Sequence, residues 1–296
     1  MSSHLTLVAL ANTVIPSELN AAFIEHAKVL GIAMAREGME CPQAKYFTAR
    51  WTCSQDLMPE ARVAMREIAT AHDTDLAFLS PGFKPNEVKV LAMDMDSTLI
   101  TIECIDEIAD MQGLKPQVAA ITEAAMRGEI EFRESLTRRV AFLKGLSAEV
   151  LQQVYNQKLR LNPGAEQLVS TAQQAGIKVL LVSGGFTFFT EKLKARLSLD
   201  AAHANVLDQE DGRLTGKVNG RILDAQGKAD TLAAFAQALG AQTQQIIAIG
   251  DGANDLKMLG LAGYSVAYRA KPVVRAQANY ALNFAGLDGV LNWFEN

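Results

Sequence analysis

A short apolar run that ends in two carboxylates places the strongest constraint on how this chain can fold. Residues 88–98 read Val-Lys-Val-Leu-Ala-Met-Asp-Met-Asp-Ser-Thr. A strand this apolar is expected to be buried, and the carboxyl end of a buried strand is where open α/β sheets bind their ligands. Asp94 and Asp96 would repel each other there unless a cation lay between them, which favours a hard metal such as Mg²⁺. The alternative is a solvated turn, because Asp and Ser are common turn residues.

The composition is that of a globular chain with a sizeable core, since 49% of the 296 residues are hydrophobic. The net charge of −5 and a pI near 5.5 argue against a general polyanion binder, so no nucleic-acid partner is expected. No apolar run approaches the roughly 20 residues of a membrane span, and the first residues lack a signal-peptide pattern. The three cysteines have no CxxC spacing, which fits a reducing compartment. We therefore expect a cytoplasmic protein with no membrane partner.

Residues 1–80 alternate short apolar runs with amphipathic ones in a β-α-β-β-α-β order. This order predicts a small ferredoxin-like α+β domain and resembles the amino-acid-binding regulatory domains known as ACT domains. Order alone does not give function, so a dimerisation module or a purely structural appendage is an equally good interpretation. Residues 81–87 contain two prolines and a glycine, which predicts a linker. The catalytic domain is then expected to span residues 88–296.

From residue 103 to about 157 the pattern is wholly helical, with glycines and a proline between the helices. Because this block interrupts a sheet that resumes later, it predicts a helical cap over the strand ends. The alternative is a long crossover connection. Beyond residue 162, helices and apolar strands alternate again, which predicts a doubly wound, Rossmann-like α/β core with a parallel sheet and helices on both faces.

Polar motifs follow three of the predicted strands, at residues 94–98, 183–185 and 250–255. The carboxyl ends of parallel strands lie along one edge of a sheet, so these motifs can converge although they are far apart in the sequence. Asp94 and Asp251 are candidate Mg²⁺ ligands, and the metal would bring a phosphate oxygen into its octahedron. Other residues are expected to surround these ligands as follows: Ser183 and Gly184 as a phosphate site at a helix N-terminus, Lys228 as a further positive group, and Asn254 and Asp255 on the first turn of the next helix.

Several competing motifs fail. Residues 250–255 begin like a dinucleotide loop, but they lack its third glycine and place carboxylates where a pyrophosphate would lie. The stretch from Asp94 resembles the start of a calcium loop, yet Leu99 and Ile105 stand where that loop needs glycine and glutamate. No histidine lies in the three motifs, which disfavours a zinc site or a Ser-His-Asp triad.

The residues quoted above match, in order, the four motifs of the haloacid dehalogenase-like phosphohydrolases, and the resemblance covers roughly residues 88–290. In the helical block, Glu103, Phe132 and Arg139 resemble the cap residues of the phosphoserine phosphatase family. This resemblance implies a carboxylate nucleophile at Asp94 and a proton donor and acceptor at Asp96, whose carbonyl would also bind Mg²⁺. It further implies supporting roles for a second group of residues: Lys228, Ser183 and Asn254 at the phosphoryl group, and Thr98 and Asp255 behind the metal ligands.

The same resemblance implies how the cap selects its substrate. Arg139 would bind the carboxylate of phosphoserine in a two-pronged hydrogen bond, Glu103 would pair with its ammonium group, and Phe132 would exclude water. The leading hypothesis is a Mg²⁺-dependent hydrolysis of O-phospho-L-serine to L-serine, the last step of serine biosynthesis. Alternatives are phosphothreonine or another small phosphorylated metabolite as substrate, phosphoryl transfer to an alcohol, and a phosphoacceptor signalling module. A homodimer through the N-terminal domain and serine sensing by that domain are further hypotheses.

Overall fold

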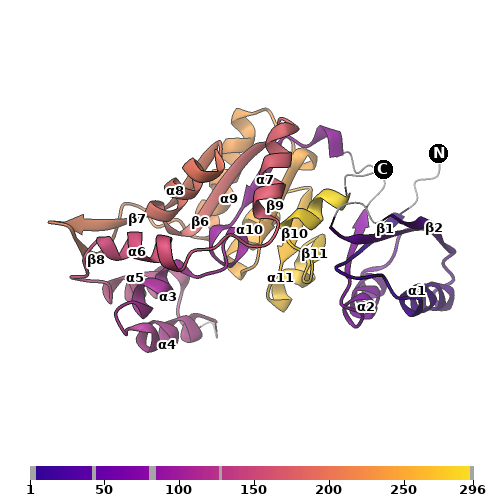
Figure 1. Cartoon of the computed structure of the whole chain (residues 1–296), viewed down its shortest axis with the longest axis horizontal. Helices are drawn as coiled ribbons and strands as arrows, with labels where there is room; N and C mark the ends of the chain where they lie inside the picture. Colours follow the sequence, from indigo (N-terminus) through magenta and orange to yellow (C-terminus); the bar gives the residue numbers. More distant parts are fainter. Residues whose placement is uncertain (1–4, 42–44, 80–84, 127–128, 294–296) are drawn as a thin grey trace.

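The computed structural model describes residues 5–41, 45–79, 85–126 and 129–293. It contains two sheets, one of four strands and one of seven, which lie at opposite sides of an elongated molecule (Figure 1). The prediction of an α/β core with a helical insertion, preceded by a small α+β domain, is confirmed. Residues 81–84 of the predicted linker lie outside the described residues, and Pro85–Glu87 forms one 3₁₀ turn. Among the helices described here, none has both the length and the apolar character that crossing a membrane requires.

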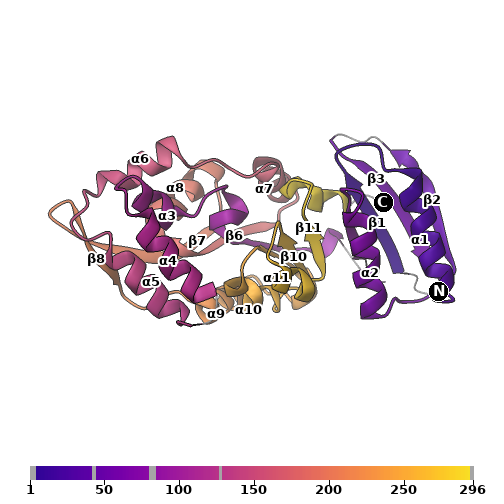
Figure 2. The same ribbon diagram turned by 90° about the horizontal axis from the view of Figure 1, so that it is seen from below.

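The N-terminal sheet is antiparallel, with the strand order β2-β3-β1-β4. Its helices cover one face (Figure 2). Side chains of a strand alternate between the two faces, so Leu7 and Ala9 pack under these helices, whereas Val8 and Leu10 join the core of the second domain. Both faces of β1 are therefore buried. The elements are β1 (Leu5–Ala11), α1 (Ser17–Val29), β2 (Met34–Cys41), β3 (Phe47–Cys53), α2 (Pro59–Thr70) and β4 (Asp75–Leu79).

The seven-stranded sheet has the order β11-β10-β9-β5-β6-β7-β8, and all pairs are parallel except β7 with β8. The central strand is β5, and β9 and β6 flank it. Every residue of β5 and β9 is buried, and so is the apolar part of β6 from Val179 to Ser183, as expected for strands covered on both faces. The strands are β5 (Val90–Met93), β6 (Lys178–Phe186), β7 (Ala201–Glu210), β8 (Arg213–Asn219), β9 (Ile246–Gly250), β10 (Tyr264–Tyr268) and β11 (Tyr280–Leu282).

Helices pack on both faces of this sheet. One face carries α7 (Ala165–Gln174), α8 (Thr187–Leu197) and the 3₁₀ helix η5 (Leu287–Trp293). The other carries α9 (Ala225–Ala238), α10 (Leu256–Leu259) and α11 (Pro272–Gln277). The antiparallel pair β7–β8 turns at Asp211 and Gly212, which both have positive φ angles of 49° and 73°. An Asp-Gly turn with positive φ at both residues matches the right-handed twist of the two strands that it connects.

The helical insertion forms a cap at the same end of the molecule as β8 (Figure 2). It consists of α3 (Cys104–Asp110), α4 (Lys115–Met126), α5 (Phe132–Ala141) and α6 (Glu149–Gln157). Leu136, Val140 and Leu143 bury their side chains in the same apolar cluster as Phe186 and Leu193. The cap and the parallel sheet therefore share one continuous core.

The two domains are joined by hydrogen bonds as well as by apolar packing. Asp75, the first residue of β4, is 2% exposed, and its carboxylate accepts backbone N–H bonds from Asn283 (2.6 Å), Phe284 (3.2 Å) and Ala285 (2.8 Å). Burial raises the pKa of this carboxyl to about 6, although the three N–H groups oppose the shift. A buried acid thus ties the N-terminal sheet to the segment after β11.

Replacing this acid is expected to weaken the junction. Asp75→Ala leaves three backbone N–H groups without their acceptor, which should lower the free energy of unfolding by about 2–3 kcal/mol. Urea denaturation followed by circular dichroism measures the change. Asp56→Ala is the control, because that side chain is 70% exposed where it pairs with Arg62 and should cost under about 1 kcal/mol. Equal effects of the two substitutions would contradict the role of Asp75.

Candidate active site

The nucleophile predicted from the sequence lies directly after the central strand. Asp94 is 4% exposed, and its Oδ1 accepts hydrogen bonds from the Met95 N–H and from Lys228 Nζ, both at 2.7 Å. Burial raises the pKa of Asp94, with Asp255 adding to the shift and Lys228 opposing it. The carboxylate is therefore held in one orientation by a strand end and a buried cation.

Asp96 lies two residues further on, in a tight turn formed by Met95–Leu99. Its Oδ1 accepts the Cys104 N–H at 3.1 Å. Burial, together with the nearby carboxylate of Glu103, raises the pKa of Asp96 to about 7. A carboxyl group with this pKa can both give and take a proton near neutral pH.

Lys228 is 1% exposed and reaches the site from α9. Its ammonium group pairs with Asp94 and with Asp255 Oδ1, both at 2.7 Å. Burial disfavours the charged amine, but the two carboxylates outweigh it and raise the pKa of Lys228. A lysine that reads as an ordinary helix residue in the sequence is thus a buried ammonium between two acids.

Asp251 and Asp255 follow β9 and are arranged differently. Asp255 is fully buried, and its Oδ2 accepts the N–H groups of Asp251 and Gly252, both at 3.1 Å. Asp251 is half-buried and accepts the Thr98 hydroxyl at 3.0 Å. Burial and the neighbouring Asp255 raise the pKa of Asp251 to about 7. Asp255 and Thr98 therefore orient the loop, whereas Asp251 keeps a carboxylate available at the site.

Asp94, Asp251 and Asp255 form an acidic group that can hold a metal ion. One carboxylate oxygen from each lies within 4.8 Å of the others. Three buried or half-buried acids face a single lysine, and the pKa values of Asp94 and Asp251 are raised accordingly. A hard divalent cation would relieve this repulsion, and oxygen donors are the ligands it prefers. Both oxygens of Asp255 already have partners, Oδ1 in Lys228 and Oδ2 in two N–H groups. The contacts of Asp94 described above use its Oδ1, so Asp94 and Asp251 fit a metal best.

Ser183 and Gly184 lie beside these acids, but not where the sequence predicted. β6 continues through both residues to Phe186, and α8 begins only at Thr187, so they are not at a helix N-terminus. The prediction was wrong because the strand continues beyond its apolar run: the Gly184 carbonyl accepts the amide of Asn205 in β7 at 2.8 Å. Ser183 is fully buried, and its Oγ accepts the Gly185 N–H at 2.8 Å.

Asn254 and the glycines at the site are placed by close contacts. A Cβ added to Gly252 would lie 2.2 Å from Asn254 Oδ1, so the Asn254 side chain folds over its own loop. A Cβ at Gly185 would lie 2.6 Å from Asp96 Oδ2 and 3.0 Å from Ser183 Oγ. Only glycine leaves room for the Asp96 carboxyl at that point.

The cap residues face the same site. A Cβ at Gly184 would lie 3.1 Å from Phe132 Cζ, which puts the aromatic ring of α5 against the strand end. Glu103 lies at the start of the cap and accepts the Ser97 hydroxyl at 2.7 Å. Burial lowers the pKa of Arg139, while the carboxylates of Asp106, Glu103 and Asp96 oppose the change. The positive guanidinium group is therefore close enough to these three carboxylates to be stabilised by their negative charge.

Two buried polar atoms of the cap, Ser135 Oγ and Asp106 Oδ1, have no hydrogen-bond partner among the described residues. Ser135 is 1% exposed and lies four residues before Arg139 on α5. Neither was predicted from the sequence, and neither was Asn205 or Asn162, both buried amides that hold backbone near the motifs. Nothing in the local sequence marks them, since Ser135 lies in a largely charged stretch and Asn162 directly precedes a Pro-Gly pair.

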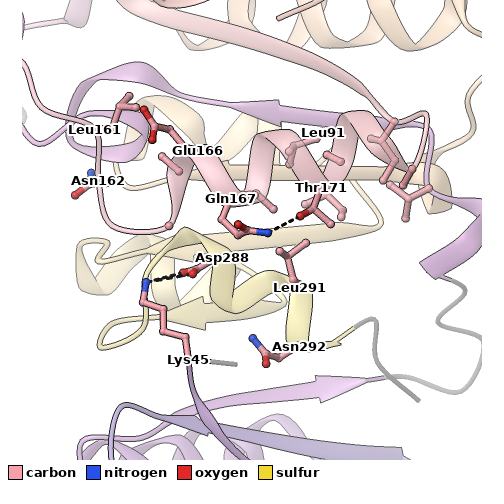
Figure 3. A pocket seen from close by; sticks show the side chains of 18 of the residues that line it. Lys45, Leu91, Leu161, Asn162, Glu166, Gln167, Thr171, Asp288, Leu291 and Asn292 are labelled. Carbon is pink, nitrogen blue, oxygen red and sulfur yellow. Dashed lines mark hydrogen bonds and ion pairs between the residues drawn. The ribbon is translucent and has the colours of Figure 1, made fainter. Parts of the chain in front are cut away.

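The structure also contains a cavity of about 1300 Å³ that the sequence did not predict. It lies between the N-terminal domain and the face of the sheet covered by α7 and η5, where Lys45 pairs with Asp288 (Figure 3). Its lining includes Val88, which precedes β5, and Leu91 and Ile247, each the second residue of its strand, β5 or β9. The cavity therefore lies toward the amino ends of these strands. The acidic group lies at the carboxyl ends of the same strands, so this cavity is not the active site.

The fold and the site define a class of protein: a hydrolase with a Rossmann-like α/β domain, an acidic group that can hold a metal ion at the carboxyl edge of the parallel sheet, and a helical cap. Residues 91–260 match the family model described as haloacid dehalogenase-like hydrolase. The chain belongs to this family.

Two similar relatives within the family are both named phosphoserine phosphatases. A phosphoserine phosphatase of Polaromonas sp. (strain JS666) is 54% identical over 217 residues, which are 72% of this chain and 92% of the relative. That of Haemophilus influenzae is 48% identical over 226 residues, covering 76% and 72% of the two chains.

Solved structures agree with this placement. A haloacid dehalogenase family hydrolase from Salmonella enterica serovar Typhi superposes with a TM-score of 0.87 at 32% identity, over 99% of both chains. A probable phosphoserine phosphatase from Vibrio cholerae, in unliganded form, gives a TM-score of 0.75 at 36% identity, over 97% of this chain and 85% of the other.

The space at Gly185 gives a direct test of the site's geometry. In Gly185→Ala the new methyl group must displace Asp96 or Ser183, and a misplacement of about 1 Å is expected to lower kcat by about 100-fold. Steady-state phosphatase assays measure the loss. Gly260→Ala is the control, because Gly260 is exposed, has a helical φ of −66° and lies outside the three motifs. Full activity of Gly185→Ala would show that this packing does not matter.

Proposed function

We propose that this chain hydrolyses O-phospho-L-serine to L-serine and phosphate with Mg²⁺ as its metal. The relatives described as phosphoserine phosphatases, at 42–54% identity, support this assignment. The observation that carries it on the structural side is the position of the cap: Phe132 lies against Gly184, and the Arg139 guanidinium interacts with Glu103 and Asp96. A phosphorylated amino acid needs a phosphate site and both charge types within one small enclosure.

The first chemical step is assigned to Asp94. Its carboxylate forms a bond to phosphorus while the bond from phosphorus to the serine oxygen breaks, which leaves an aspartyl-phosphate. The proton of Asp96 passes to the serine oxygen as it leaves. Lys228 holds Asp94 in position at 2.7 Å and provides positive charge beside the transferring group.

The second step reverses the role of Asp96. Its carboxylate takes a proton from water, the water oxygen bonds to phosphorus, and the bond to Asp94 breaks. A pKa of about 7 suits a group that must be acid in one step and base in the next. Mg²⁺, held by Asp94, Asp251 and the Asp96 carbonyl, supplies further positive charge for the phosphoryl oxygens when it is bound.

Recognition of the amino acid is assigned to the cap. Arg139 binds the substrate carboxylate, Glu103 binds the ammonium group, and Phe132 closes over the ligand. The unpartnered hydroxyl of Ser135 and the unpartnered oxygen of Asp106 support a polar ligand on this side. The same chemistry on phosphothreonine or on another small phosphate, and phosphoryl transfer to an alcohol, are the alternatives that a substrate panel with product analysis separates.

Three features stay predictions. These are the domain limits (1–80, 81–87 and 88–296, with the cap at about 103–157), a homodimer through the N-terminal domain, and serine sensing by that domain. The N-terminal fold and its burial against β11 and η5 are compatible with either a regulatory or a structural role.

The most direct test is phosphate release from phosphoserine. The wild-type chain with Mg²⁺ should release phosphate and serine in equal amounts, and removal of the metal with a chelator should stop the reaction. Asp94→Asn keeps the shape of the side chain and should lower kcat by more than about 1000-fold, because the amide is not a nucleophile. Release that survives both changes would refute the mechanism.

The role of Arg139 predicts a substrate-dependent effect. Arg139→Ala removes a charged hydrogen-bond pair and should raise KM for phosphoserine about 30- to 100-fold. With O-phosphoethanolamine, which has the phosphate and ammonium groups but no carboxylate, the change should stay within about threefold. Arg138→Ala is the matched control, because Arg138 pairs with Glu134 on the outer side of α5. Equal increases in KM for both substrates would remove Arg139 from carboxylate recognition.

A further inference from the structure

The chain passes between the α/β domain and the helical cap at two places that lie side by side. It leaves the α/β domain through the turn Met95–Leu99 and returns to that domain through residues 160–162. The two crossings are paired through their backbones, because the Thr101 N–H donates to the Arg160 carbonyl and the Asn162 N–H donates to the Leu99 carbonyl, both at 2.9 Å. This backbone pairing does not depend on the side chain at position 162.

The side chain of Asn162 makes a second, separate set of contacts. It is 6% exposed, and its Nδ2 donates to the carbonyls of Ser97 (3.2 Å), Thr98 (2.8 Å) and Ile100 (3.0 Å). Asn162 also lies at the edge of the cavity between the domains (Figure 3). The two N–H groups of one buried amide are thus shared among three carbonyl oxygens in and directly after the turn that carries Asp96.

These carbonyls need an outside partner because the turn is irregular. Its internal hydrogen bonds run from the Leu99 N–H to the Asp94 carbonyl and from the Ile100 N–H to the Met95 carbonyl. Ser97 lies in the left-handed region at φ 56°, a conformation that costs a side-chain-bearing residue free energy. Such a conformation persists only where surrounding contacts hold it.

Holding the backbone of this turn matters more for the orientation of Asp96 than for that of Asp94. Asp94 is fixed by Lys228 and by its own neighbour's N–H. The Cys104 N–H holds Asp96 Oδ1, but Asp96 also directly precedes the strained residue Ser97. The direction of its carboxyl therefore depends as well on the backbone that the amide holds. We propose that Asn162 is a positioning residue that aims Asp96 for proton transfer to the leaving group.

This inference rests on the proposed role of Asp96 as proton donor, and it predicts an effect that depends on the leaving group. Serine leaves as an alcohol and needs a proton as its bond to phosphorus breaks, whereas p-nitrophenolate leaves without one. The value of kcat/KM reports only steps up to phosphoryl transfer to Asp94, so it separates the two cases.

The experiment compares kcat/KM for phosphoserine and p-nitrophenyl phosphate in the full chain with Mg²⁺. Asn162→Ala should lower the value for phosphoserine about 100-fold and the value for the aryl ester less than about threefold. Asn162→Thr has a similar volume and one hydroxyl donor, so it should recover part of the phosphoserine activity. Asn292→Ala is the control, because it removes a buried amide from the same cavity whose Nδ2 donates to the Gly289 carbonyl, away from the turn that carries Asp96.

Equal losses on both substrates would overturn the proposal, and so would a Thr variant as impaired as the Ala variant or an unchanged Ala variant. If Asn162→Ala does not fold, the Thr variant carries the same comparison. If the wild type does not act on phosphoserine, the proposed function fails by itself, and the leaving-group comparison is then made with O-phosphoethanolamine as the alkyl ester.

Discussion

The structure depends on a concentration of negative charge at one edge of a parallel sheet. Asp94, Asp251 and Asp255 come together around the ammonium group of Lys228, and three of these four groups are almost completely buried. Coulomb repulsion between buried acids costs several kcal/mol unless it is balanced. The balance comes from Lys228, from backbone N–H groups and, when a metal is bound, from a divalent cation.

This constraint explains why so much of the surrounding structure serves to hold backbone in place. Thr98 and Asp255 orient the loops that carry Asp251, Asn205 fixes the strand end at Gly184, and Asn162 fixes the turn after β5. Apart from the contact of Asp255 within its own loop, these contacts join segments that are distant in the sequence. The backbone contacts therefore help to keep the charged groups at their separations, together with the ion pairs that Lys228 makes.

The sequence predicts the fold class because its signals are local: apolar strands separated by helices of crossover length, and an Asp-Gly turn in the hairpin. It also predicts which residues meet, because Asp94, Ser183 and Asp251 each follow a buried strand. It places Ser183 and Gly184 wrongly at a helix N-terminus, since the extension of β6 depends on pairing with Asn205. The contacts of Asp75 and Asn162 could not be predicted, because a lone polar residue gives no indication of a partner 60 to 210 positions away.

The central claim is that phosphoserine is cleaved by transfer of its phosphoryl group to Asp94. The most direct measurement is rapid quenching of the wild-type chain with ³²P-labelled phosphoserine and Mg²⁺, followed by isolation of the labelled peptide. We expect a label on the peptide containing Asp94, formed no later than free serine and lost as phosphate appears. Release of phosphate without a labelled enzyme, or a label on another residue, would contradict it.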